Sequence, residues 1–272
     1  MNQPDWRSLA QTIEALCQEV GDRLLLEFGT LQATEKADGS LITAADRWAD
    51  QTLCDRLSQL FPKHALLTEE SQQTFGGADW TWVVDPLDGT TNFAQGIPIW
   101  GISLALLYRG WPVFGAIALP PLQRFYCGVD TRSTDLAPVA WAERNHQPLQ
   151  LRTESLGSNQ LFSLCTRSAI VLQRWSAPFP CKIRMLGAST ANFLTVLEGT
   201  TLGALEATPK IWDIAAVWVL AQALGADWRS LAGEQFPLQS GRDYGSVNWP
   251  TLLLARPALQ EAFESWAALL TR

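Results

Sequence analysis

The spacing of hydrophobic residues changes twice along this 272-residue chain, and these changes limit the folds that it can form. In residues 6–28, and again from Thr43 to just before Pro62, apolar residues recur every three or four positions, which predicts two amphipathic helices. Glycine and proline then separate short apolar runs as far as Val129, a pattern typical of strands. After Pro138, strand-like and helix-like segments alternate.

These patterns predict an α+β half, of about residues 1–138, joined to an α/β half, of about residues 139–272, in a single unit spanning 1–272. Within the first half, Arg109-Gly110 predicts an antiparallel hairpin. The expected strands are 65–69, 80–85, 102–108, 113–119, 124–129, 160–165, 181–185, 203–207 and 251–255, and the later helices are 169–175, 190–197, 213–224 and one after Pro257.

Composition excludes several classes of function. The chain has 20 Lys and Arg against 27 Asp and Glu, a net charge of −7, so it has no basic surplus for binding nucleic acid. Its two histidines, His64 and His146, are too few for a His-rich zinc site, and each lies near a proline in a loop-like setting that does not favour a Ser-His-Asp triad. Because 47% of the residues are hydrophobic, a chain of this length can fold around its own core.

The five cysteines are scattered, which favours buried thiols in a reducing compartment over disulfides or a zinc site. The N-terminus has no basic region followed by an apolar one, so a secretory signal is not expected. Charged residues, glycine and proline interrupt every long apolar stretch, including the longest at Arg109. We therefore expect a cytoplasmic protein with no membrane partner.

The segment from Trp82 to Phe93, WVVDPLDGTTNF, is the most informative for chemistry. An apolar strand leads into Asp85, a second acid follows at Asp88, and Pro86 makes the turn between them rigid. Gly89 then allows close approach of a ligand to the backbone. Two acids beside a cluster of N–H groups suit Mg²⁺ with a bound phosphate. The alternative is a turn in which the acids only cap backbone donors.

Three other acids have both a catalytic and a structural interpretation. In the strand end at Glu69 and Glu70, adjacent side chains point to opposite faces, so we expect one glutamate to face Asp85. Asp46 lies where it can reach back to cap a helix that starts at Thr43. Asp213 fits the first turn of a helix, where an acid interacts favourably with the helix dipole.

Together, Glu69-Glu70-Ser71, the run from Asp85 to Phe93 and Trp212-Asp213-Ile214-Ala215-Ala216 resemble the metal-dependent, lithium-sensitive phosphatases typified by inositol monophosphatase. The resemblance covers almost the whole chain, with both signatures in the expected order. It implies a layered αβαβα sandwich with the metal cluster between its halves, and relatives are commonly homodimers.

The resemblance also implies roles for individual residues. One Mg²⁺ would be bound by Glu69, Asp85 and the carbonyl of Leu87, a second by Asp85, Asp88 and Asp213, and a weaker third ion near Glu69. Asp46 and Thr90 would orient the attacking water, and the amides of Gly89 and Thr90 would hold the phosphate. The alcohol portion of the substrate would contact Gly187, Ala188, Ser189 and Glu206.

The expected activity is hydrolysis of a phosphomonoester by metal-activated water, with two or three Mg²⁺ per site. Two cations that share a carboxylate activate water and clamp the phosphoryl group, so no histidine base is needed. Glu206 favours inositol monophosphate or a similar polyol phosphate as the substrate. At Ala188 and Ser189 the sequence departs from the Thr-Ala of the animal inositol enzymes, and this departure favours a broader range of substrates. The alternatives are histidinol phosphate, a sugar or nucleotide bisphosphate or, in another class, a non-catalytic metal-binding regulatory protein.

Overall fold

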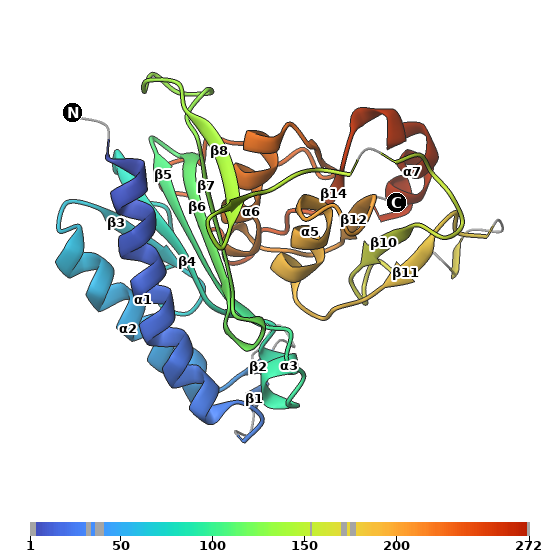
Figure 1. Cartoon of the computed structure of the whole chain (residues 1–272). Helices are drawn as coiled ribbons and strands as arrows, with labels where there is room; N and C mark the ends of the chain where they lie inside the picture. The colour runs from blue at the N-terminus through green and yellow to red at the C-terminus, as the bar shows by residue number, and fades with distance from the viewer. Residues whose placement is uncertain are drawn as a thin grey trace.

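The computed structural model describes residues 4–30, 34–35, 41–152, 154–169, 173–174 and 178–270. Two helices, α1 (Trp6–Glu27) and α2 (Ala44–Leu60), form the outer layer of the N-terminal half. Their apolar residues face the sheet beside them, as the three-to-four spacing predicts, and Ile13, Val20 and Leu53 are fully buried. A two-stranded sheet, β1 (Thr34–Glu35) and β2 (Leu41–Ile42), lies near the end of α1 (Figure 1).

The larger sheet has seven strands in the order β3-β4-β5-β6-β7-β8-β9. Strands β3 and β4 are parallel, and each other neighbouring pair is antiparallel. The bounds are β3 Ala65–Thr68, β4 Trp80–Asp88, β5 Gly101–Tyr108, β6 Trp111–Leu119, β7 Arg124–Asp130, β8 Ala140–Arg144 and β9 Gln147–Pro148, with a short helix α3 (Thr90–Ala94) after β4 and a 3₁₀ turn at Pro120–Leu122.

The smaller sheet has five strands in the order β11-β10-β12-β14-β13, in which β11, β10 and β12 run parallel. The bounds are β10 Leu161–Leu164, β11 Lys182–Arg184, β12 Gly203–Glu206, β13 Asp227–Ser230 and β14 Thr251–Leu254; the helices are α5 Ser189–Leu197, α6 Ile211–Leu224 and α7 Gln260–Ala267, with 3₁₀ turns at Pro257–Leu259 and Ala268–Leu270. None of the helices within the described ranges combines the length and the apolar character needed to cross a bilayer.

The elements stack in five layers (Figure 1). Helices α1 and α2 cover one face of the larger sheet, and α5 and α6 lie between the two sheets. Helix α7 covers the far face of the smaller sheet, where Phe263 packs on Phe162 of β10 with their ring centroids 4.4 Å apart. The αβαβα arrangement expected from the resemblance is therefore confirmed.

Most predicted elements are present, and the differences have local causes. Strands β8, β9 and β13 were not predicted because they lie at or near sheet edges and show no clear run of buried apolar residues. Strand β4 continues past Asp85 to Asp88 through a register shift around Pro86, which has no N–H to donate to the ladder. The helix expected at 169–175 lies largely outside the described residues.

Cysteine burial differs in part from expectation. All five cysteines are free thiols; three are buried, but Cys54 and Cys165 are only half-buried.

Close packing of β6 on α6 positions the start of α6, which carries Asp213. A Cβ built at Gly115 of β6 would lie 2.4 Å from the carbonyl oxygen of Ala216 and 2.9 Å from its Cα. The contact is between two backbones, so no side-chain rotation can relieve such a clash. The helix can lie this close to the sheet because residue 115 is glycine.

We expect Gly115→Ala to lower the free energy of unfolding by about 1 to 3 kcal/mol, because the extra methyl group overpacks this contact. Urea denaturation measures the change. The control is Gly76→Ala, since a Cβ at Gly76 would meet nothing within 4 Å. Equal stability of the Gly115→Ala variant and the unmodified protein would contradict this account of the packing.

Candidate active site

A cavity of about 360 Å³ lies where the two halves of the chain meet. Its lining includes Glu69 and the turn after β4 from one half, and the start of α5, the end of β12 and the start of α6 from the other. The residues predicted from the sequence that line it are Glu69, Asp85, Leu87, Asp88, Gly89, Thr90, Gly187, Ala188, Ser189, Glu206 and Asp213. Asp46 is the one predicted residue outside this lining.

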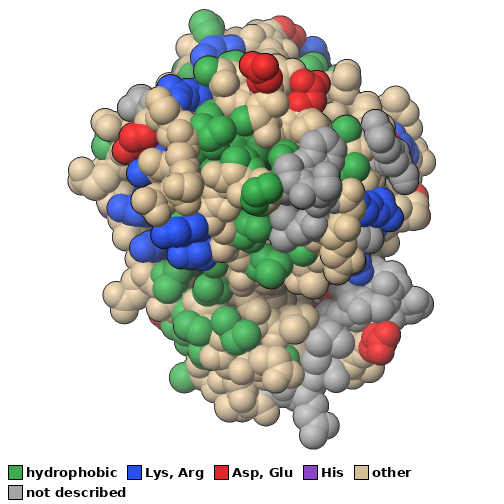
Figure 2. All heavy atoms as spheres, turned by 90° about the vertical axis from the view of Figure 1, so that its right-hand side faces the viewer, with side chains coloured by type: hydrophobic (Ala, Val, Ile, Leu, Met, Phe, Trp, Pro, Cys, Tyr) green, Lys and Arg blue, Asp and Glu red, His purple; other side chains and the backbone are tan. Residues whose placement is uncertain are grey.

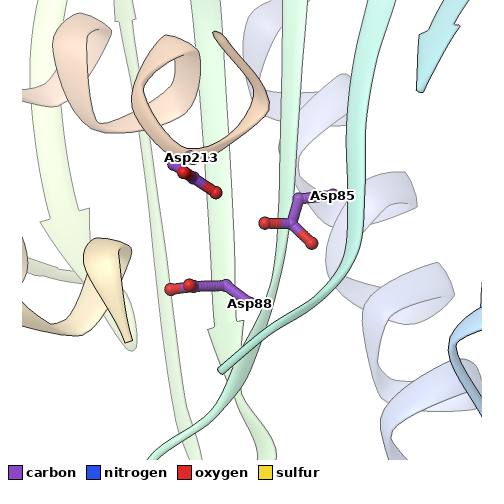
Figure 3. A group of neighbouring side chains, drawn as sticks. All are labelled: Asp85, Asp88 and Asp213. Carbon is purple, nitrogen blue, oxygen red and sulfur yellow. The ribbon is translucent and has the colours of Figure 1, made fainter. Parts of the chain in front are cut away.

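Three acids converge inside this cavity. Each of Asp85, Asp88 and Asp213 offers a carboxylate oxygen, and these oxygens lie within 4.8 Å of one another. Figure 3 shows the three side chains approaching one another; Asp85 and Asp88 come from β4, on either side of its register shift, and Asp213 comes from the first turn of α6. Residues 128 positions apart in the sequence, Asp85 and Asp213, thus form one group.

Burial and mutual repulsion act on this acid cluster. Burial, followed by the charges of Glu69 and Asp213, raises the pKa of Asp85 well above its ordinary value. The pKa of Asp213 is also well raised, by burial and then by Asp88 and Glu69. Removing these carboxylates from water disfavours their ionised forms, and a cation among them would reverse that effect.

The donor set fits a hard divalent cation. Asp85 is fully buried, its Oδ1 accepts the N–H of Leu87 at 3.0 Å, and its Oδ2 receives no hydrogen bond within the described residues. A fully buried carboxylate oxygen without a donor is costly unless another group, such as a cation, compensates its charge. Oxygen ligands of this kind are those that Mg²⁺ prefers.

Glu69 and Glu70 line different cavities, although β3 ends at Thr68 and both follow it in a bend rather than in the strand that was expected to reach 69. Glu69 lines the cavity that holds the acid cluster, and its charge contributes to the raised pKa of Asp85. Glu70 instead lines a separate cavity with Arg47 and Asp50.

Asp88 is held by the first residues of α5, in the other half of the chain. One of its oxygens accepts the N–H of Ser189 at 3.1 Å, and the other accepts the N–H of Thr190 at 2.8 Å and also its hydroxyl. Thr190 is fully buried, so this contact is closed to water. This role of Thr190 could not be predicted from the sequence, because the contact spans 102 positions.

The two oxygens of Asp46 have different partners, and the capping interpretation is confirmed. Its Oδ2 accepts the N–H and the hydroxyl of Thr43, at 2.7 and 2.5 Å, and so caps α2. Its Oδ1 accepts the hydroxyl of Thr90 at 2.9 Å, and that hydroxyl is also 3.2 Å from the carbonyl oxygen of Leu87. The cap thus fixes a carboxylate next to a hydroxyl that lines the cavity.

Gly89 has a left-handed backbone, with φ of 89°, immediately before α3. A Cβ here would lie 3.0 Å from that of Ala188 and 3.1 Å from the carbonyl oxygen of Ile99. Nearby, the amide of Asn92 donates to the carbonyls of Ile99 and Leu186, both at 2.7 Å, and so joins the two halves. The glycine permits the close approach that brings Ala188 to the acid cluster.

Glu206 lies at the end of β12 and is 2% exposed. Its oxygens accept the amide of Asn192 at 2.7 Å and the hydroxyl of Ser189 at 3.3 Å. Burial raises the pKa of Glu206 well above its usual range, and the charges of Asp88 and Asp213 add to the shift. This carboxylate forms a polar wall beside the acid cluster.

Sequence reasoning missed part of the lining. The lining residues outside the predicted set are Thr91, Cys165, Thr166, Arg167, Asn192 and Thr208. Several follow β10 and β12, which are parallel neighbours whose carboxyl ends share one edge of the smaller sheet. Ligands commonly bind at such edges, but the pairing of these strands had not been assigned from the sequence.

The family model "Inositol monophosphatase family" matches residues 5–262. A fructose-1,6-bisphosphatase/inositol-1-monophosphatase from Aquifex aeolicus is 28% identical over 74% of this chain and 76% of its own length. A histidinol-phosphatase from Mycobacterium tuberculosis is 29% identical over 82% of this chain and 87% of its own. The solved IMPase of Thermotoga maritima is similar in fold, with a TM-score of 0.79 and 21% identity, over 97% of this chain and 98% of that one.

The family match extends over both sheets and includes every residue of the acid cluster. This chain therefore belongs to the inositol monophosphatase family, and it is a phosphatase that hydrolyses phosphoric monoesters.

Proposed function

We propose that the chain is a Mg²⁺-dependent phosphatase of inositol monophosphate or a similar small polyol phosphate. The observation that carries the proposal is the composition of one cavity, in which the acid cluster, Gly89-Thr90 and Glu206 lie together. These supply, respectively, cation ligands, backbone amides next to a left-handed glycine, and an acceptor for hydroxyl groups.

Two to three Mg²⁺ ions are proposed to bind in this cavity. Glu69, Asp85 and the carbonyl of Leu87 would hold one, and Asp85, Asp88 and Asp213 would hold a second, with a weaker third near Glu69. Bound cations of this kind activate water and neutralise charge on the phosphoryl group. Two observations support the assignment: the Oδ2 of Asp85 receives no hydrogen bond from the described residues, and the pKa values of Asp85 and Asp213 are raised.

Asp46 and Thr90 are the proposed positioning pair for the attacking water. The hydroxyl of Thr90 already donates to Asp46, so its lone pairs are directed away from that carboxylate and can accept a hydrogen bond from the water. The cap at Thr43 holds Asp46 in place, which fixes the pair before substrate arrives. Glu69 would complete the catalytic set, and the amides of Gly89 and Thr90 would bind phosphate oxygens.

The alcohol portion of the substrate is proposed to lie against Gly187, Ala188, Ser189 and Glu206. A polyol offers hydroxyl donors, and a buried carboxylate such as Glu206 accepts such donors strongly. Asp88 and Asp213 would border the same subsite. The name of the Mycobacterium tuberculosis relative supports histidinol phosphate as an alternative, and that of the Aquifex aeolicus relative supports a sugar bisphosphate.

We also propose that the protein is a cytoplasmic, lithium-sensitive homodimer. Its five free thiols suit a reducing compartment. Figure 2 shows hydrophobic side chains gathered on one face, and Leu156 and Met185 in the C-terminal half are 40% and 55% exposed. Exposed apolar patches commonly mark contact surfaces, and the molar mass in solution tests the dimer.

Replacing Thr90 by valine removes the proposed water-orienting hydroxyl but keeps the shape of the side chain. We expect kcat to fall by about 100-fold, as for the loss of a positioned proton-transfer group, with little change in KM. Steady-state kinetics in saturating MgCl₂ measures both. The control is Thr134→Val, whose hydroxyl donates only to a nearby turn carbonyl, Thr131 O, at 2.8 Å. An unchanged kcat for Thr90→Val would exclude this role.

A substrate panel tests the proposed activity. We expect hydrolysis of myo-inositol 1-phosphate in MgCl₂ and loss of activity when EDTA removes the metal. The panel also contains histidinol phosphate, fructose 1,6-bisphosphate and adenosine 3′,5′-bisphosphate, and released phosphate is measured. Turnover of histidinol phosphate without turnover of inositol phosphate would replace the proposed substrate by the alternative.

A further inference from the structure

The part of the cavity wall that follows β10 carries a positive charge. Among the described residues that line the cavity, Arg167 is the only lysine or arginine. It shares the lining with five acids, Glu69, Asp85, Asp88, Glu206 and Asp213. Arg167 is exposed, so solvent and a ligand in the cavity can reach it.

Strand pairing fixes the backbone that carries Arg167. Strands β10 and β12 are parallel, and beyond their carboxyl ends the N–H of Cys165 donates to the carbonyl of Leu205 at 3.3 Å. The N–H of Ala207 donates to the sulfur of Cys165 at 3.4 Å. Beyond these contacts the guanidinium of Arg167 donates to the hydroxyl of Thr208 at 2.7 Å, so two strand extensions hold this side chain at the cavity wall.

Among the described residues, no acid forms an ion pair with Arg167. Within the described ranges its partner is the neutral hydroxyl of Thr208, through a single Nη1 donor. Glu206, two residues before Thr208, instead accepts from Asn192 and Ser189. A guanidinium has five N–H donors, so Arg167 retains donors for an anionic ligand.

We propose that Arg167 is a specificity-determining residue that binds a second phosphate group on the alcohol portion of the substrate. The substrate class is a small sugar or polyol with two phosphates, one at the acid cluster with its cations and the other at Arg167. A planar guanidinium binds phosphate through two parallel hydrogen bonds, which gives both affinity and orientation. This inference rests on the proposed phosphatase activity and adds bisphosphates to the substrates of the same site.

The sign of the charge separates the candidate substrates. Arg167 attracts the second phosphate of a bisphosphate, leaves a neutral inositol ring nearly unaffected, and repels the ammonium group of histidinol. The competing explanation is that Arg167 attracts any phosphomonoester into the cavity. In that case, removing its charge would lower kcat/KM equally for the bisphosphate, inositol phosphate and histidinol phosphate.

The test compares Arg167→Gln with the unmodified protein on fructose 1,6-bisphosphate, myo-inositol 1-phosphate and histidinol phosphate in saturating MgCl₂. We expect kcat/KM for the bisphosphate to fall about tenfold, mainly through KM, as for the loss of one charge-assisted contact. The value for inositol phosphate should stay within about twofold, and that for histidinol phosphate should not fall. Arg167→Lys, which keeps the charge, should restore part of the loss.

The control is Arg56→Gln, which removes an exposed arginine paired with Glu19 on the outer helices, and it should leave all three values unchanged. An equal fall on all three substrates, or no fall on the bisphosphate, would overturn the assignment of Arg167 while the phosphatase activity stands. If the unmodified protein hydrolyses none of the three, the proposed function fails, and this inference fails with it.

Discussion

Three carboxylates that the fold holds within 4.8 Å of one another, in a place largely removed from water, set the main constraint on this molecule. Such an arrangement raises the free energy of the metal-free protein, because burial and repulsion both disfavour the ionised acids. Packing between the surrounding helices and sheets must therefore supply the stability that holds these carboxylates together. Gly115 lets α6 lie against the larger sheet, and the start of that helix carries Asp213. The position of the acid cluster therefore depends on how the helices and sheets pack on one another.

Several acids use one oxygen for a local structural hydrogen bond and leave the other for the chemistry that we propose. Asp46 caps α2 with one oxygen and accepts the hydroxyl of Thr90 with the other. Asp213 accepts the N–H of Lys210 at the start of α6 through Oδ2, and Asp85 fixes its own turn through the N–H of Leu87. This shared use explains why a structural and a catalytic interpretation of one residue need not compete. A local hydrogen bond restricts the side chain, which prepares it to position a ligand.

Local pattern predicted much of the fold and of the acid cluster, and it failed where information lies far away in the sequence. The helices α1 and α2 were predictable because their apolar faces repeat at helical spacing, and Asp85 because a strand ends in a rigid acidic turn. Strand β13, at a sheet edge, and β8, next to the edge strand β9, were missed because neither shows a clear run of buried apolar residues. Arg167 was missed because its place in the cavity depends on the pairing of β10 with β12 and on a contact across 41 positions.

The most direct test of the account measures how Mg²⁺ changes the stability of the protein and of its Asp85→Asn variant. Mg²⁺ at about 100 times its Kd should stabilise the unmodified protein by about 2.7 kcal/mol, because the ion binds the folded chain alone. The variant should be more stable than the unmodified protein without metal, since one buried repelling charge is gone, and should lose most of the Mg²⁺ effect. Asp130→Asn, a buried acid paired with Arg132 outside the cavity, is the control and should keep the Mg²⁺ effect. An equal stabilisation by Mg²⁺ in the Asp85→Asn variant would contradict the account.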